Sequence, residues 1–225
     1  MLDTIKVTYE ATNKPYHAIQ ILQSLPDLAA FDFEAACIYT AKEQAKFAEI
    51  AQDESIDIVQ RRYYNVMSKA TALSHPSMVE LTHLAIGISE SEGYVLILDT
   101  DRMRKLVLNW LTTTEVTQIW HNASYDFKHI YFHTHKFPKN YEDTQQLAKS
   151  IVNHVEVFKA KVGLKDLKGT DYGAWGISAD YFDQSQMYNK TVLEYAATDG
   201  CATYSIWQDI QRYLKEIHDE NIYSL

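Results

Sequence analysis

The sequence of 225 residues predicts an α/β fold in which a mixed central sheet is flanked by helices. The apolar stretch 28–36 has the length and composition of a buried strand. Residues 81–89 and 94–98 alternate like the two strands of a hairpin, with serine, glutamate and glycine between them. A helical pattern and a further strand at 116–120 follow, so we expect three antiparallel strands and then parallel ones, with helices on the faces of the sheet.

The first third of the chain is predicted to be largely helical around the strand 28–36. Residues 5–9 alternate like a short strand, and 16–25 have helical spacing up to a proline. The segment 41–72 contains polar and apolar residues in a pattern compatible with helices. It is longer than a turn between two strands requires. We therefore expect a helical insertion at about 41–75.

The second half of the chain contains clearer helix signals. Asp101 is a plausible N-cap for a helix with apolar residues at i, i+3, i+4 and i+7, and Asp143 fits a second cap. Residues 161–189 are irregular and aromatic. A final helix is expected at about 190–214, followed by a loose tail.

The composition bounds the class of protein. With 46% hydrophobic residues, 7 glycines and 4 prolines, the chain is long enough for one well-buried core, and we expect a single domain over 1–225. Neither a signal peptide nor a membrane span is visible, so we expect a cytoplasmic protein without a membrane partner. Two cysteines, Cys37 and Cys201, cannot form a disulfide framework.

The charge argues against a protein that coats long nucleic acids. The formal net charge is −9, which is the wrong sign for many phosphate contacts. An enzyme that holds only a few nucleotides at a strand end needs few such contacts. Carboxylates that bind metal are also included in the formal net charge, although a bound metal ion would neutralise them. The acidity is therefore compatible with local binding of a strand end or with tethering by a partner.

The candidate site begins at two carboxylates in the apolar stretch. Along a strand, Asp32 and Glu34 point to one face while Phe31 and Phe33 point to the other. Two carboxylates on one face of such an apolar strand repel each other and lose solvation, and a divalent cation with oxygen ligands would offset this. An edge strand with its acidic face in water is the alternative, so the metal hypothesis needs further ligands.

Two further acidic positions are available downstream. A strand ends at His121 and Asn122 and is followed by a helix-start signal, which puts Asp126 in the first turn of a helix. Near the C-terminus, Tyr195 and Asp199 are four residues apart in a helical pattern and share one face.

In this order, Asp32-x-Glu34, Asn122-x-x-x-Asp126 and Tyr195-x-x-x-Asp199 resemble the three exonuclease motifs of the DEDD superfamily of 3'-5' exonucleases. The similarity is to the tyrosine branch of these DnaQ-like proteins, and most closely to the proofreading domain of family A DNA polymerases. It extends from about residue 5 to 212 and implies an RNase H-like fold. The histidine branch would need a histidine where this chain has Glu194.

The resemblance implies a site with two divalent metal ions, Mg2+ or Mn2+. Asp32 would bridge both ions, and Glu34 and Asp199 would complete the site that activates a water molecule. Asp126 would hold the second ion through its water ligands. Tyr195 would orient the attacking water, because a phenol with a pKa of ~10 is a poor base at neutral pH.

The predicted substrate-binding residues are Asn122, Phe33, His121 and Lys165. Lys165 and the nearby Lys168 could meet phosphates, although surface lysines usually meet only water.

Two other groups fit structural roles better than functional ones. The run Arg61-Arg62-Tyr63-Tyr64 could stack on a single strand but is more typical of a half-solvated helix. The histidines His129, His133 and His135 lack a fourth ligand for zinc.

The sequence therefore predicts an enzyme that releases nucleoside 5'-monophosphates from the 3' end of single-stranded DNA. It would work alone or as the proofreading subunit of a separate DNA polymerase chain in DNA replication, with the 41–72 segment as a docking candidate. A 3'-5' exoribonuclease is one alternative. A non-catalytic binding module is another, although such degenerate domains usually lack one of the carboxylates.

Overall fold

The computed structural model describes residues 4–151, 161–173, 175–176 and 184–223. The strands are β1 (Thr8–Thr12), β2 (Leu28–Cys37), β3 (Val79–Gly87), β4 (Glu92–Ile97), β5 (Thr117–Trp120) and β6 (Tyr141–Asp143). They form a six-stranded sheet in the order β1-β4-β3-β2-β5-β6. β2, β3 and β4 are antiparallel, while β1, β5 and β6 each join in parallel. The predicted mixed sheet is confirmed.

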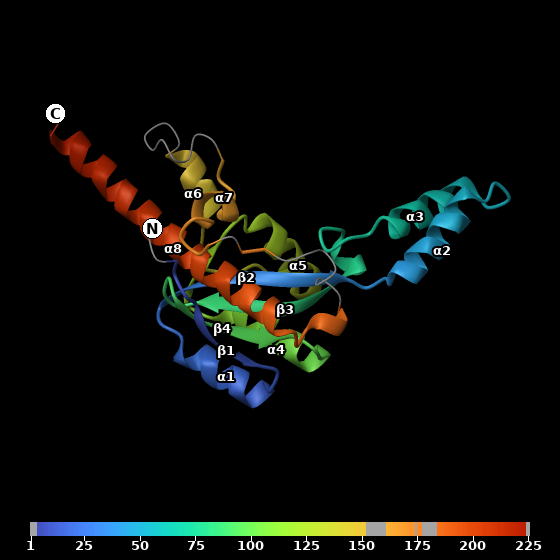
Figure 1. The fold of residues 1–225 in the computed structure, drawn as a ribbon, viewed down its shortest axis with the longest axis horizontal. Coiled ribbons are helices and arrows are strands. Elements are labelled where there is room, and N and C mark those ends of the chain that lie inside the picture. Colours follow the sequence, from blue (N-terminus) through green and yellow to red (C-terminus); the bar gives the residue numbers. More distant parts are fainter. Residues whose placement is uncertain (1–3, 152–160, 174, 177–183, 224–225) are drawn as a thin grey trace.

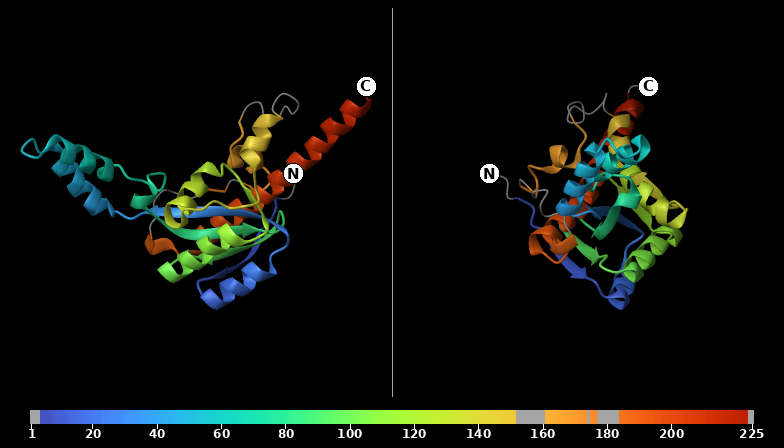
Figure 2. Two further views of the ribbon diagram at one scale, coloured as in Figure 1. Left: turned by 180° about the vertical axis from the view of Figure 1, so that it is seen from behind. Right: turned by 90° about the vertical axis from the view of Figure 1, so that its right-hand side faces the viewer.

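Helices cover both faces of this sheet. They are α1 (Pro15–Ser24), α2 (Ala41–Gln52), α3 (Ile58–Ser68), α4 (Asp101–Thr113), α5 (Ser124–Thr134), α6 (Thr144–Ser150), α7 (Leu164–Lys168) and α8 (Lys190–Tyr223), with short 3-10 turns η1 (Pro76–Met78) and η4 (Gln184–Gln186). α8 crosses one face of the sheet, and α1, α4 and α5 pack on the other (Figures 1 and 2). None of the helices in the described ranges is both long and apolar enough to cross a membrane.

The central strand β2 shows the alternation that its sequence predicts. Phe31 and Phe33 face α1, α4 and α5, where their rings lie 5.6 and 5.8 Å from that of Trp120. Burying each ring contributes about 1.5–3 kcal/mol to stability. Asp32 and Glu34 point to the opposite face, toward α8. The buried aromatic face thus fixes which way the carboxylates point.

Two glycines allow α8 to lie directly on β3. A Cβ atom on Gly87 would be 2.3 Å from the carbonyl oxygen of Gly200, and one on Gly200 would be 3.2 Å from the nitrogen of Gly87. No side chain fits between the two backbones at this crossing. Asp199 precedes Gly200 in α8, so the close approach sets its height above the sheet.

The structure corrects the predicted ends of several elements. Thr100, rather than Asp101, caps α4, because its hydroxyl accepts a hydrogen bond from Met103 N at 3.2 Å. The first strand begins at Thr8, because Ile5 N donates instead to Asp171 O at 2.8 Å.

The predicted loose tail was wrong for residues 215–223, which continue α8; the last two residues lie outside the described part. No glycine or proline follows Gly200 to end that helix.

The segment predicted as a helical insertion forms the two helices α2 and α3. Figure 1 shows this pair extending away from the sheet. Thr40 and Glu43 form a capping box at the start of α2, and the rings of Phe47 and Tyr64 lie 5.8 Å apart between the helices. Tyr63, which belongs to the run Arg61-Arg62-Tyr63-Tyr64, is largely exposed on α3. We call this pair the α2–α3 arm.

Candidate active site

The sheet and α8 bring three acidic side chains together. The carboxylates of Asp32 and Glu34 on β2 and of Asp199 on α8 have ligand oxygens within 4.8 Å of one another. Glu34 and Asp199 are buried, and Asp32 is partly exposed. We refer to these three residues as the carboxylate cluster.

Asp126 lies beside the carboxylate cluster on α5. It is 2% exposed, and its Oδ1 accepts a hydrogen bond from the backbone N–H of Phe33 at 3.2 Å. Burial raises the pKa of Asp126 to about 8. The first turn of α5 therefore attaches a fourth carboxylate to the middle of the Asp32-Phe33-Glu34 segment, as the motif spacing predicted.

The electrostatics of the cluster favour a bound cation. Burial, followed by the neighbouring carboxylates, raises the pKa of Asp32 and Glu34 well above the usual range. The buried Oε1 atom of Glu34 has no hydrogen-bond partner among the described residues. An acceptor in that position loses hydration without compensation. Carboxylate oxygens are the ligands that Mg2+ and Mn2+ prefer, so the donor set fits a hard divalent cation.

Tyr195 and Asp199 form one hydrogen-bonded unit on α8. The Tyr195 hydroxyl donates to the Asp199 carboxylate. Burial raises the pKa of Tyr195 above its ordinary range, and the charge of Asp199 adds to this. The phenol is therefore protonated at neutral pH, and it can orient a neighbouring group by hydrogen bonding but cannot act as a base.

Lys165 on α7 reaches into this unit. Its Nζ lies 2.7 Å from Tyr195 Oη and 3.2 and 3.3 Å from the two carboxylate oxygens of Asp199. In this structure the lysine predicted to bind substrate therefore contacts the acidic residues themselves.

Trp175 is a further contact of Asp199 that was not predicted from the sequence. Its indole Nε1 donates to Asp199 Oδ1 at 2.6 Å. A partly buried indole N–H needs a hydrogen-bond acceptor. A tryptophan in this aromatic stretch of the sequence therefore indicated a contact with a polar group.

Asn122 and His121 occupy the turn between β5 and α5. Asn122 has a φ of 63°, a left-handed conformation that asparagine tolerates better than most residues. Its N–H donates to Asp143 Oδ1 at 3.1 Å, and Asp143 also caps α6, as predicted. His121 bonds to Thr144 at 2.8 Å, and burial lowers its pKa to about 4. A neutral His121 cannot serve as a cation for phosphate.

Two other candidate contacts are placed differently from expectation. The ring of Phe33 is 3% exposed and packs in the core, so only its backbone serves the site. Lys168 is buried and forms ion pairs with Asp209 and Asp171. A phosphate contact from Lys168 would require breaking both pairs, so it holds α7 against α8 instead.

A cavity of about 870 Å³ opens over the carboxylates. Its lining includes Asp32, Asp126 and Tyr195, together with Gln44 and Leu73 at the base of the α2–α3 arm. A space of this size accepts a ligand of several hundred Å³. Gln44 at the start of α2 and the segment 70–73 that follows α3 therefore form one wall of the candidate active site.

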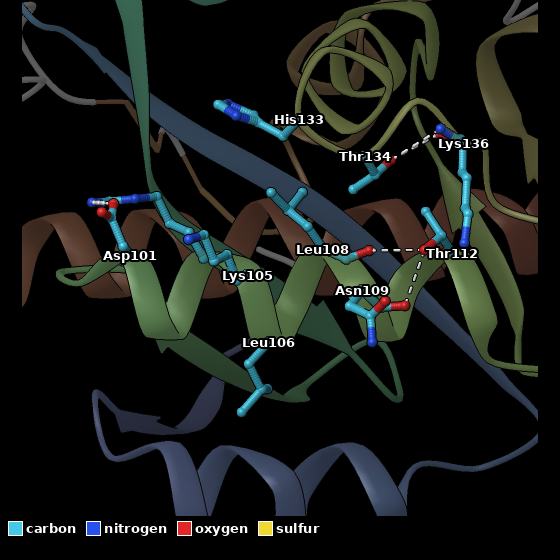
Figure 3. Close-up of a pocket in the computed structure, with 10 residues that line it drawn as sticks. Asp101, Lys105, Leu106, Leu108, Asn109, Thr112, His133, Thr134 and Lys136 are labelled. Atoms are coloured by element: carbon cyan, nitrogen blue, oxygen red, sulfur yellow. Dashed lines mark hydrogen bonds and ion pairs between the residues drawn. The ribbon is translucent and has the colours of Figure 1, made fainter.

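A second hollow of about 580 Å³ lies between α4 and α5 (Figure 3). It is lined by Lys105, His133 and Lys136, among others, and contains none of the site carboxylates. His129 is buried in α5 with a pKa lowered to about 4 by burial. Among the described residues, these histidines belong to no group of three or more potential metal ligands.

Neutralising one carboxylate should stabilise the protein when metal is absent. We expect Asp32→Asn to raise the free energy of unfolding in EDTA by about 1 kcal/mol, since one pKa unit of repulsion corresponds to about 1.4 kcal/mol. Urea denaturation followed by circular dichroism measures this. Added Mn2+ should stabilise the wild type more than the variant. The exposed Glu49→Gln is the control, and a less stable Asp32→Asn in EDTA would contradict repulsion in the cluster.

Several solved structures have a similar fold. The chain is similar to Brucella melitensis NrnC with bound Mg2+, at 15% identity and a TM-score of 0.56, over 96% of this chain and 84% of that one. It is also similar to Trypanosoma brucei RNase D in a complex with RNA U12, at 14% identity and a TM-score of 0.53, over 93% of this chain and 63% of that one.

A third similar structure is Escherichia coli RNase D, described as an exoribonuclease involved in structured RNA processing. It matches at 13% identity and a TM-score of 0.50, over 93% of this chain and 46% of that one. Neither the family models nor the curated proteins that were searched give a match. At these identities the likeness establishes the RNase H-like nuclease fold that the sequence predicted.

Proposed function

We propose that the chain is a divalent-metal-dependent 3'-5' exonuclease that acts on single-stranded RNA. The observation that carries the proposal is the carboxylate cluster with a buried, unpartnered oxygen on Glu34, at the floor of a cavity of about 870 Å³. Without a bound cation, a cluster of this kind would leave the protein with repulsion that Lys165 compensates only in part. In a catalytic cluster, the bound divalent metal ions would offset this repulsion.

Hydrolysis of a phosphodiester needs charge stabilisation on the entering and the leaving oxygen, which two bound divalent ions supply. Asp32, Glu34, Asp199 and Asp126 would hold those ions. The protonated hydroxyl of Tyr195 would orient the attacking water by a hydrogen bond. The burial of Glu34, Asp126 and Asp199 would limit bulk water at the reacting phosphate and strengthen each hydrogen bond made there.

RNA is better supported as the substrate than the DNA that the sequence motifs suggested. Of the structurally similar proteins described above, one is named in a complex with RNA and another as an exoribonuclease. The expectations of a DNA 3' end, a role in proofreading and a polymerase partner receive no such support. The carboxylate site itself is indifferent to the sugar, so discrimination would depend on contacts to the 2'-hydroxyl.

Oligomers of one sequence made entirely of RNA or entirely of DNA test this proposal. We expect 5'-labelled single-stranded RNA to shorten from its 3' end with release of nucleoside 5'-monophosphates, only with Mg2+ or Mn2+, and DNA to be shortened more slowly. Gel electrophoresis and chromatography of the products measure both rates. An RNA with one 3'-terminal deoxynucleotide isolates the contribution of the 2'-hydroxyl at the reacting end.

The controls separate the alternatives. The variant Asp32→Asn should be inactive on both polymers, which excludes a contaminating nuclease. Faster cleavage of DNA, with a preference for mismatched over matched 3' ends, would return the assignment to a proofreading enzyme. Binding of RNA without any product in either metal would indicate a non-catalytic module.

A further inference from the structure

One cation faces the carboxylate cluster from the side of α7. The ammonium of Lys165 contacts both oxygens of Asp199 and lies 4.5 Å from the centre of the Tyr195 ring. Its charge counteracts the rise in pKa of Asp32, Glu34 and Asp199 alike. Lys165 therefore acts on all three carboxylates of the cluster, and not only on its hydrogen-bonded partner.

The helix that carries Lys165 is held in place, whereas the lysine side chain is long and partly exposed. α7 packs on α8 through Leu164 and Leu167, and the ion pair between Lys168 and Asp209 ties the two helices together. The side chain of Lys165 is 44% exposed and has a flexible four-carbon stem. The ammonium can thus leave Asp199 without any movement of the helix.

The hydrogen bonds at Asp199 show which group would have to leave. Three donors share its carboxylate: the indole N–H of Trp175, the hydroxyl of Tyr195 and the ammonium of Lys165. A carboxylate offers about four lone-pair directions, so a metal ion has little room beside all three. The first two donors are neutral and tolerate a cation nearby, whereas the ammonium repels one.

We propose that Lys165 is an internal counter-cation that competes with a divalent metal ion for Asp199 and is displaced when the ion binds. This inference rests on the proposed metal site and deepens it. Gly163 and Leu164, next to Lys165, line the cavity. The displaced ammonium then lies at the rim of the cavity, where the phosphate contact predicted from the sequence becomes available to it.

Metal affinity in the absence of nucleic acid tests the competition. Mn2+ is titrated into the protein, and the free ion is measured by electron paramagnetic resonance. We expect Lys165→Met to bind Mn2+ about 10-fold more tightly than the wild type, because a positive charge within a few ångströms of the ion is removed. Lys165→Arg keeps the charge and should stay within about 3-fold of the wild type.

The matched control is Lys161→Met, which removes an exposed lysine that pairs only with Asp166 among the described residues. Its Mn2+ affinity should equal that of the wild type. Thermal melts followed by circular dichroism show whether each variant is folded, and Lys165→Gln replaces the methionine variant if that one is not.

The outcomes distinguish this inference from the proposed function. If the wild type binds Mn2+ and Lys165→Met and Lys165→Gln bind it equally well or more weakly, the competition is refuted while the metal site stands. If the wild type itself does not bind Mn2+, the metal site is refuted and the competition with it. The inference is supported if Lys165→Met or Lys165→Gln binds Mn2+ more tightly than the wild type while Lys165→Arg and Lys161→Met do not.

Discussion

Replacing Asp32 or Asp199 by alanine is expected to reduce the proposed exonuclease activity at least about 1000-fold, because several kcal/mol of charge stabilisation would be lost with the metal site. Tyr195→Phe should retain measurable activity, since a single positioned hydrogen bond contributes about 10- to 1000-fold. The rate of nucleotide release from 5'-labelled RNA at saturating Mn2+ measures all three variants. The expected ordering follows from the proposed roles, in which the converging carboxylates would hold the metal ions and the phenol would only orient a water molecule.

Asp219→Ala is the matched control, because it removes an exposed carboxylate from the same helix α8. It should leave the rate unchanged. If Asp32→Ala kept more than about a tenth of the activity, the carboxylate cluster would not be the catalytic centre. If Tyr195→Phe were as inactive as Asp32→Ala, the hydroxyl would have to do more than orient a water molecule.

Gly87→Ala is expected to lower the free energy of unfolding by about 2–3 kcal/mol, in the range of overpacked cores. The new Cβ would meet the backbone oxygen of Gly200 at 2.3 Å, and a backbone atom cannot rotate away as a side chain can. α8 would have to lift from β3 and carry Asp199 with it. Activity should therefore fall even at temperatures where the variant remains folded.

Urea denaturation and the rate of RNA cleavage measure the two effects of Gly87→Ala. Gly176→Ala is the control, since a Cβ there meets nothing within 4 Å. A variant at Gly87 with wild-type stability would show that the crossing of α8 and β3 is looser than the structure indicates. Lost stability with full activity would show that the position of Asp199 does not depend on this contact.

The residues that the sequence identified best are those whose placement is decided locally. The faces of β2 follow from strand alternation, which separates Asp32 and Glu34 from the buried phenylalanines. Tyr195 and Asp199 share a face because they are four residues apart in a helix. The approach of these segments to one another was supplied by the family resemblance, since no local pattern encodes it.

The features that the sequence did not identify depend on contacts between distant segments. Trp175, which was not predicted, meets Asp199 across 24 positions of the chain. Lys165 was predicted as a substrate contact, but its bond to Asp199, across 34 positions, was not. The strand β6 has three residues, too few for a periodic pattern, and it exists through its pairing with β5. Local patterns therefore predict the candidate metal ligands, whereas the residues that surround these ligands are determined by tertiary contacts.

The distance along the chain between the acidic residues also bears on how the protein folds. Asp32 and Glu34 lie in β2, whereas Asp199 arrives with the last helix, which docks against strands formed by the first half of the chain. We expect contacts between such distant segments to form late, because closing long loops is entropically costly. Asp32 and Glu34 already repel each other within β2, and Asp199 adds its own repulsion when α8 docks. A metal ion available at that step would favour docking and so promote the last stage of folding.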